Sequence, residues 1–112
     1  MPHPRERHLI EVLKKRLRFS PVVAIQGARQ VGKSFLVREL LPKEIPSIGY
    51  RTLDRPSDRD FATTNPETFL EQFPEEVLAA IDEAQKAPRL FDAIKYNVDR
   101  NRRPGQYLLL GS

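Results

Sequence analysis

The stretch GARQVGKS, at residues 27–34, has the residue types and spacing of a phosphate-binding loop, G-x-x-x-x-G-K-[ST]. In such a loop, successive backbone N–H groups and the start of a helix point at phosphate oxygens. Gly27 and Gly32 have no Cβ, so the backbone can close around the phosphates. Lys33 can reach the β- and γ-phosphates, and the Ser34 hydroxyl can join the ligand shell of Mg²⁺. The stretch therefore predicts a nucleotide site.

Two adjacent carboxylates form the second group of residues that could bind a metal or act in catalysis. Asp82 and Glu83 directly follow the apolar run VLAAI at residues 77–81. If that run is a strand of a parallel sheet, both acids lie at the carboxyl edge, where ligands bind. Asp82 is then expected to hold Mg²⁺ through a water, and Glu83 to accept a proton from an attacking water. A solvated turn is the alternative, and the preceding phosphate loop favours the functional interpretation.

Elements on both sides of the loop are predicted to position it. Residues 21–25, PVVAI, form a short β-branched run typical of a buried parallel strand. Downstream, apolar side chains recur at helical spacing until Pro42, which we expect to end the helix. These side chains are Phe35, Leu36, Val37, Leu40 and Leu41. The order strand, loop, helix is the context that a phosphate-binding loop requires.

The rest of the chain continues the alternation of strands and helices, which indicates an α/β domain. The predicted elements are a strand over 48–53 leading into a turn over 54–58, a short helix with Asn65 as N-cap that ends before Pro74, a helix that begins at 87–91, and a strand over 106–110.

Composition narrows the class of protein. The chain has 112 residues, enough for one domain, and no cysteine for a disulfide or thiolate metal site. His3 and His8 are too few for a metal cluster. With no long apolar run and no signal-peptide centre, a cytoplasmic location without membrane contact is expected.

The net charge of +4 comes from the N-terminal segment. There, Glu6 and Glu11 are outnumbered by six basic side chains: Arg5, Arg7, Lys14, Lys15, Arg16 and Arg18. We predict an amphipathic helix over residues 1–20 that caps the sheet with its apolar side and solvates its basic face. The alternative, contact with an acidic protein or with nucleic acid through residues 5–18, stays open.

With these residues in view, the sequence resembles the prokaryotic AAA-type ATPases that carry a C-terminal domain of unknown function. That family has a loop close to GPRQVGKT, a Leu-Asp pair after strand two, an acidic DEIQ strand end followed by Pro, and a TGS strand end. The matching pieces here are GARQVGKS, Leu53-Asp54, Asp82-Glu83-Ala84-Gln85 with Pro88, and Leu110-Gly111-Ser112. Two positions depart from the pattern: Ala28 replaces a proline, and Leu110 replaces a threonine.

The resemblance implies a P-loop NTPase three-layer sandwich with a parallel sheet of order 1-4-3-2. Residues 21–112 are expected to form the core through strand four, as the N-terminal part of an ATPase domain. Family members continue with a fifth strand beside strand one and with nucleotide-sensing residues and an arginine finger. We therefore expect the 112-residue chain to bind ATP weakly, to turn it over little, and to self-associate through the open edge of strand one.

The predicted site takes ATP and Mg²⁺. The resemblance implies that Ser112, at the end of strand four, positions the attacking water, so the predicted catalytic residues are Glu83 and Ser112. The predicted metal ligands are Ser34 and Asp82. The predicted nucleotide-binding residues are Gly27, Ala28, Arg29, Gln30, Val31, Gly32, Lys33, Ser34 and Phe35.

The leading functional hypothesis is an ATP-binding P-loop module whose parent domain hydrolyses ATP. GTP is disfavoured because the sequence has neither an N-K-x-D base-reading motif nor a D-x-x-G switch after the acidic strand. A small-molecule kinase is disfavoured because Glu83 directly after Asp82 suits water activation. Two alternatives remain: a non-enzymatic module in which nucleotide orders an interaction surface that includes the basic helix, and an inactive remnant.

Overall fold

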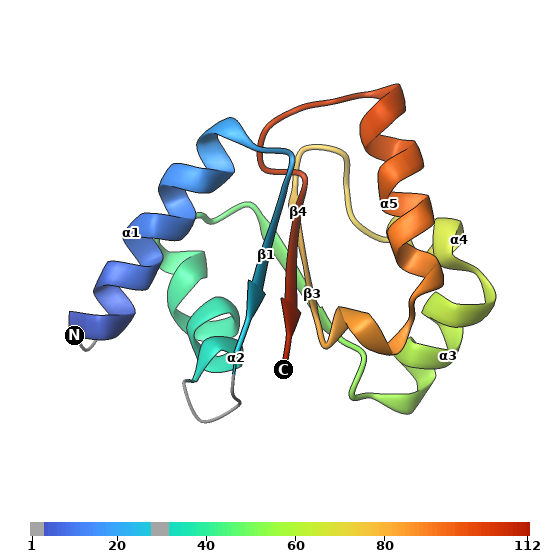
Figure 1. Ribbon diagram of the computed structural model, residues 1–112, viewed down its shortest axis with the longest axis horizontal. Helices are drawn as coiled ribbons and strands as arrows, with labels where there is room; N and C mark the ends of the chain where they lie inside the picture. The colour runs from blue at the N-terminus through green and yellow to red at the C-terminus, as the bar shows by residue number, and fades with distance from the viewer. Residues whose placement is uncertain (1–3, 28–31) are drawn as a thin grey trace.

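The computed structural model describes residues 4–27 and 32–112, which form a parallel sheet covered by helices on both faces. Its strands are β1 (Val22–Gln26), β2 (Ile48–Thr52), β3 (Leu78–Asp82) and β4 (Tyr107–Gly111). Their order across the sheet is β1-β4-β3-β2. Figure 1 shows α1 and α2 on one side of the sheet and α3, α4 and α5 on the other. The predicted α/β class and the strand order 1-4-3-2 are both confirmed.

The helical segments alternate with these strands along the chain. They are α1 (Pro4–Phe19), α2 (Lys33–Phe35), the π-helical η2 (Leu36–Leu40), the 3₁₀ turn η3 (Leu41–Lys43), α3 (Pro56–Thr64), α4 (Pro66–Leu70), the 3₁₀ turn η4 (Ala84–Lys86) and α5 (Arg89–Arg100). None of the helices among the described residues is long and apolar enough to cross a membrane.

The sheet separates two hydrophobic clusters, one on each of its faces, and the interior strand β4 contributes side chains to both. Successive side chains of a strand point to opposite faces of a sheet. Leu108 accordingly packs with the cluster under α1 and the helix after the loop, which includes Ile10 and Val37. Leu109 packs with the cluster under α4 and α5, which includes Phe69. This burial on both faces explains why β3 and β4 are apolar at nearly every position.

The segment after β2 is where the prediction of local structure was wrong. Residues 54–58 were predicted to form a turn; residues 54 and 55 do so, but α3 begins at Pro56. Proline is well suited to the first position of a helix, where its missing N–H has no helical partner to lose. The negative charge of Asp58 in the first turn is stabilised by the positive end of the helix dipole. Farther along the helix, Ala62 is buried against the core.

Two smaller predictions about helix ends also need correction. Pro42 does not end the helical region after the loop, because it lies in the first turn of η3, which continues to Lys43. Proline is tolerated there for the same reason as at the start of α3. Asn65 does precede α4 as its N-cap residue, but its side chain makes no capping hydrogen bond.

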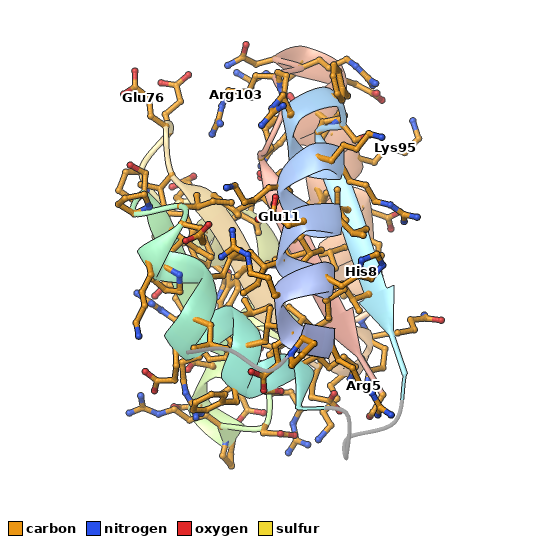
Figure 2. The ribbon with its side chains drawn as sticks, turned by 90° about the vertical axis from the view of Figure 1, so that its left-hand side faces the viewer. Arg5, His8, Glu11, Glu76, Lys95 and Arg103 are labelled. Carbon is orange, nitrogen blue, oxygen red and sulfur yellow. The ribbon has the colours of Figure 1, made fainter. Side chains whose placement is uncertain are left out.

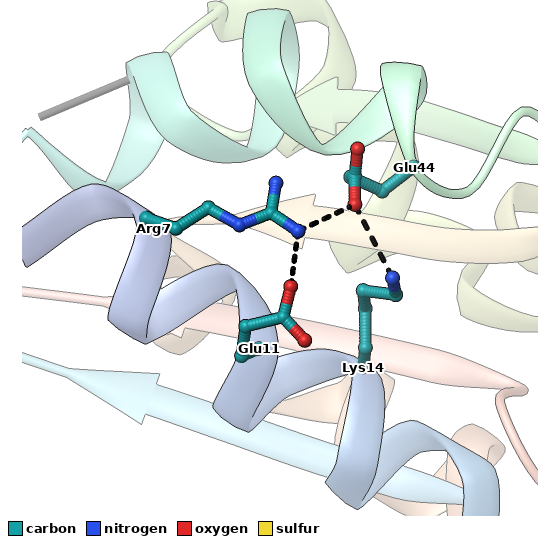
Figure 3. Close-up of polar contacts among 4 residues, drawn as sticks. All are labelled: Arg7, Glu11, Lys14 and Glu44. Atoms are coloured by element: carbon teal, nitrogen blue, oxygen red, sulfur yellow. Dashed lines mark hydrogen bonds and ion pairs between the residues drawn. The ribbon is translucent and has the colours of Figure 1, made fainter. Parts of the chain in front are cut away.

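Helix α1 packs on the sheet with its apolar side, and two of its basic side chains bind Glu44. Ile10, Leu13 and Leu17 are buried beneath it. Arg7 donates a hydrogen bond to Glu11, and Arg7 and Lys14 each donate one to Glu44 at 3.2 Å (Figure 3).

Because Glu44 directly follows η3, these contacts join α1 to the end of the helical segment that starts at the phosphate loop. Hydrogen bonds from Lys14 and Arg7 lower the pKa of the Glu44 carboxyl. Arg7 and Lys14, both on the basic side of α1, are therefore paired within the chain. Binding of an acidic partner through residues 5–18 stays a prediction, as does self-association through the edge of β1.

Candidate nucleotide-binding site

The carboxyl ends of β1, β3 and β4 lie at one edge of the sheet, beside the start of α2 (Figure 1). This is the edge at which open α/β sheets bind ligands. Gly27 follows β1, Asp82 ends β3, and Ser112 follows β4. The parallel register thus gathers residues that lie far apart in the sequence.

Gly32 is the described residue at which the predicted phosphate loop turns into a helix. Gly32 has φ 70° and ψ 25° and is the N-cap residue of α2. A side chain with a Cβ is strained in this left-handed conformation, which explains the glycine. Leu36 N donates to Gly32 O at 3.0 Å, so the helix begins directly after the turn. Ala28, Arg29, Gln30 and Val31 lie outside the described residues.

Lys33 is buried at the start of α2, with only 3% of its surface exposed. Its Cε lies 4.0 Å from the position that a Cβ on Gly27 would occupy, so the lysine stem crosses the end of β1. Burying an ammonium group is unfavourable unless an anion compensates it. The neighbouring Phe35 is 49% exposed, and Ser34 is half-buried.

Asp82 is buried and is contacted from the adjacent strand. The Tyr50 hydroxyl donates a hydrogen bond to Asp82 Oδ2 at 2.5 Å, while Oδ1 is buried and has no hydrogen-bond partner among the described residues. Burial, followed by the hydrogen bond to Asp82, raises the pKa of Tyr50, whereas hydrogen bonding by Ser34 lowers it. Ser34, Tyr50 and Asp82 therefore form one polar cluster.

This cluster fits a divalent cation. An unpartnered carboxylate oxygen in a buried position costs free energy, and a metal or a metal-bound water is a ligand that removes the cost. Hydroxyl and carboxylate oxygens are the ligands that Mg²⁺ prefers. The two predicted metal ligands lie at the start of α2, Ser34, and at the end of β3, Asp82, and Tyr50 holds the second of them.

Glu83 is buried in an unusual backbone conformation. Its φ is 55°, and among the described residues it is the one residue other than glycine with a positive φ. The Ser112 hydroxyl donates to Glu83 Oε1 at 2.9 Å, and Gln85 Nε2 donates to the same oxygen at 3.1 Å. The structure therefore brings together Glu83 and Ser112, the two predicted catalytic residues. Such strained conformations gather at functional sites.

Comparison with known proteins decides the family. The model of a family described as AAA domain matches residues 19–112. The chain belongs to the AAA domain family. The match begins at the last residue of α1 and covers the whole sheet.

Two uncharacterized proteins are similar to this AAA domain, one from Mycobacterium tuberculosis and one from Mycobacterium bovis. Each is 38% identical over 100 residues, a region that covers 89% of this chain and 22% of the relative. The chain thus spans about a fifth of the length of the curated relatives it matches. No solved structure matches it.

Two residues of this AAA domain that sequence reasoning left without a role belong to the site. Tyr50 contacts Asp82, and Gln85 orients Glu83. A Cβ on Gly111 would lie 2.9 Å from Gln85 Oε1, so the glycine lets the amide lie against the end of β4. The DEIQ-like pattern contained Gln85 but gave it no function, and Tyr50 stood out only as part of a strand.

The Leu53-Asp54 pair, which follows β2, contacts the backbone and side chains around the acidic end of β3 in the AAA domain. Leu53 is fully buried, and its backbone N–H donates to Asp82 O at 3.0 Å. Asp54 Oδ1 binds Lys86 Nζ at 2.5 Å, which ties the end of β2 to η4. The pair therefore helps to hold the backbone on both sides of Glu83.

Proposed function

We propose that this AAA domain binds ATP with Mg²⁺ and that it serves ATP hydrolysis in the protein that carries it. One observation carries the proposal: a buried lysine, a serine, two buried acids and a second serine all lie at the carboxyl edge of the sheet. They are Lys33, Ser34, Asp82, Glu83 and Ser112. This set contains a cation for phosphate, oxygens for a metal and a base for water.

Residues 27–35 take the nucleotide in this proposal. Backbone N–H groups of the loop and the Lys33 ammonium bind the β- and γ-phosphates. The burial of Lys33 supports this role, because a phosphate supplies the negative charge that a desolvated ammonium needs. Ser34 and Asp82 would hold Mg²⁺, which would screen the phosphate charge. The buried, unpartnered Oδ1 of Asp82 supports the metal assignment.

Glu83 acts as the general base in this proposal. Its carboxylate takes a proton from a water while the water oxygen forms a bond to the γ-phosphorus. The bond from that phosphorus to the bridging oxygen breaks, and ADP leaves with this oxygen. Ser112 and Gln85 both donate to Oε1 and so fix the orientation of the carboxylate.

The alternative role, a non-enzymatic interaction module that uses the basic helix, has less support. Arg7 and Lys14, which it would use for an acidic partner, bind Glu44 within the chain. Figure 2 shows Arg5 at the start of α1, whereas Arg103, near the other end of the helix, comes from the segment between α5 and β4.

The test of the proposed function is titration of a fluorescent ATP analogue in Mg²⁺ and in EDTA. Lys33→Ala removes a charge-assisted contact worth about 1.5 to 3 kcal/mol, so affinity should fall about 10- to 150-fold in both buffers. Ser34→Ala should weaken binding in Mg²⁺ more than in EDTA. Lys95→Ala, in an exposed ion pair with Asp99 on α5, is the matched control and should bind normally.

Hydrolysis needs a separate arm of the same experiment. In a full-length protein that carries this domain, Glu83→Gln should bind ATP and Mg²⁺ like the wild type and release phosphate about 10²- to 10⁴-fold more slowly, because an amide cannot take the proton. Unchanged affinity of Lys33→Ala contradicts the phosphate assignment. Unchanged phosphate release by Glu83→Gln contradicts only the assignment of the base.

A further inference from the structure

Tyr50 occupies a place in the sheet from which it can serve the metal site. In the parallel register of β2 and β3, Tyr50 lies opposite Ala80, and Thr52 lies opposite Asp82. The tyrosine is thus two residues short of the carboxyl edge, and its side chain is long enough to carry a hydroxyl to that edge. The ring packs against the hydrophobic cluster under α1, which fixes its direction.

The hydroxyl contacts one of the two side chains that we assign to the metal. It donates to Asp82 Oδ2 at 2.5 Å. Tyr50 comes from β2 and Asp82 from β3, so this hydrogen bond ties the carboxylate to the neighbouring strand.

We propose that Tyr50 is a positioning residue for Mg²⁺, whose hydroxyl fixes the Asp82 carboxylate so that Oδ1 faces the metal and its waters. The inference rests on the proposed function. It goes beyond it by adding a residue from β2, an element that the phosphate-loop and acidic-strand motifs do not include.

The physical reason lies in the two oxygens of the carboxylate. A hydrogen bond to Oδ2 removes rotational freedom from the group, and the buried Oδ1 is left as the oxygen for a metal or a metal-bound water. A metal then binds without the cost of ordering its ligand. Partners that orient ligands in this way typically contribute about 10- to 100-fold to metal affinity.

Tyr50→Phe tests the inference because it removes the hydroxyl and keeps the ring. The probe is a fluorescent ATP analogue at fixed concentration, titrated with Mg²⁺ and, in a parallel series, with Mn²⁺ followed by its electron paramagnetic resonance signal. The Mg²⁺ and Mn²⁺ concentrations at half-saturation should rise about tenfold or more. Nucleotide affinity in EDTA should stay within about twofold of the wild type, which shows that the loop is folded.

Tyr107→Phe is the matched control. Tyr107 is a buried strand tyrosine whose hydroxyl accepts a hydrogen bond from Asn97 at 3.0 Å, at the opposite end of the sheet. The control variant loses a hydroxyl of the same kind and should keep the wild-type metal dependence.

Two results overturn the inference. One is an unchanged or lower half-saturating Mg²⁺ concentration in Tyr50→Phe, where a lower value would mean that the hydroxyl competes with the metal. The other is an equal loss of nucleotide affinity in Mg²⁺ and in EDTA, which would mean a structural role. Asp82→Asn separates this failure from that of the proposed function: if it also leaves metal dependence unchanged, the metal site itself is wrongly assigned.

Discussion

Because Glu83 has a left-handed backbone conformation, we predict that a glycine at position 83 gives a more stable protein than an alanine. A residue with a Cβ at positive φ costs about 1 to 2 kcal/mol. Glycine avoids that cost but loses about 0.4 to 1 kcal/mol because its unfolded chain is more flexible. With φ 55° at Glu83, we expect Glu83→Gly to be more stable than Glu83→Ala by about 1 kcal/mol.

The comparison is made between two variants so that the lost contacts cancel. Both substitutions remove the carboxylate that accepts hydrogen bonds from Ser112 and Gln85. The difference between them therefore reports the backbone. Urea unfolding gives it directly, and thermal unfolding should show Glu83→Gly melting about 4 °C or more above Glu83→Ala.

Asp92 provides the matched control for this pair. It is exposed within α5, in right-handed helical backbone. There the usual order applies, and Asp92→Gly should be less stable than Asp92→Ala by about 1 kcal/mol. If glycine is also the less stable residue at position 83, the strain that we ascribe to Glu83 does not exist.

Two further predictions concern the packing of the helices. Glu44→Gln should lower the melting temperature at neutral pH and make the melting temperature less sensitive to acid. The pKa of Glu44 is lower in the folded protein than its ordinary value of 4.5. Its carboxylate therefore stabilises the fold above pH 4.5, and this stabilisation is lost as the pH falls through the pKa of the folded state. Equal pH profiles of the two proteins would contradict this. Phe69→Ala should cost about 3 to 5 kcal/mol in urea unfolding, because Phe69 is fully buried and makes edge contacts with Phe61 and Phe73. A loss under about 1 kcal/mol would mean that the site collapses around the gap.

Local patterns were sufficient to predict the strands and the residues that end them. The β-branched run before Gly27 and the apolar run before Asp82 each predict a buried strand, and both strands form within one residue of the predicted range. β3 is buried at every position, but the prediction of burial is wrong for β1, which lies at the edge of the described sheet and buries only Val23. The order of the strands came from the family resemblance, because no local signal determines which strands pair. The helix at Pro56 was missed because a proline among polar residues suits a turn as well as a first helical position.

The contacts around the acids could not be predicted from spacing. Tyr50 and Asp82 are 32 residues apart in the sequence, and Ser112 and Glu83 are 29 residues apart, yet each pair is joined by a hydrogen bond. The register of the sheet decides which of many polar side chains face one another, and no pattern within either segment contains that register. The αL conformation of Glu83 is likewise set by its surroundings, since glutamate has no preference for it.

The position of β4 between β1 and β3 has a consequence for the order of events in folding. β1 and β3 each pair with β4, and no direct pairing joins them. The strand that precedes the phosphate loop therefore has no partner in this sheet until residues 107–111 have been synthesised. Closing so long a segment is slow, because its entropy is lost before the contacts form. While the ribosome is still making the chain, the segments on either side of β4 are expected to collapse separately, and the nucleotide edge can assemble only when β4 inserts between them.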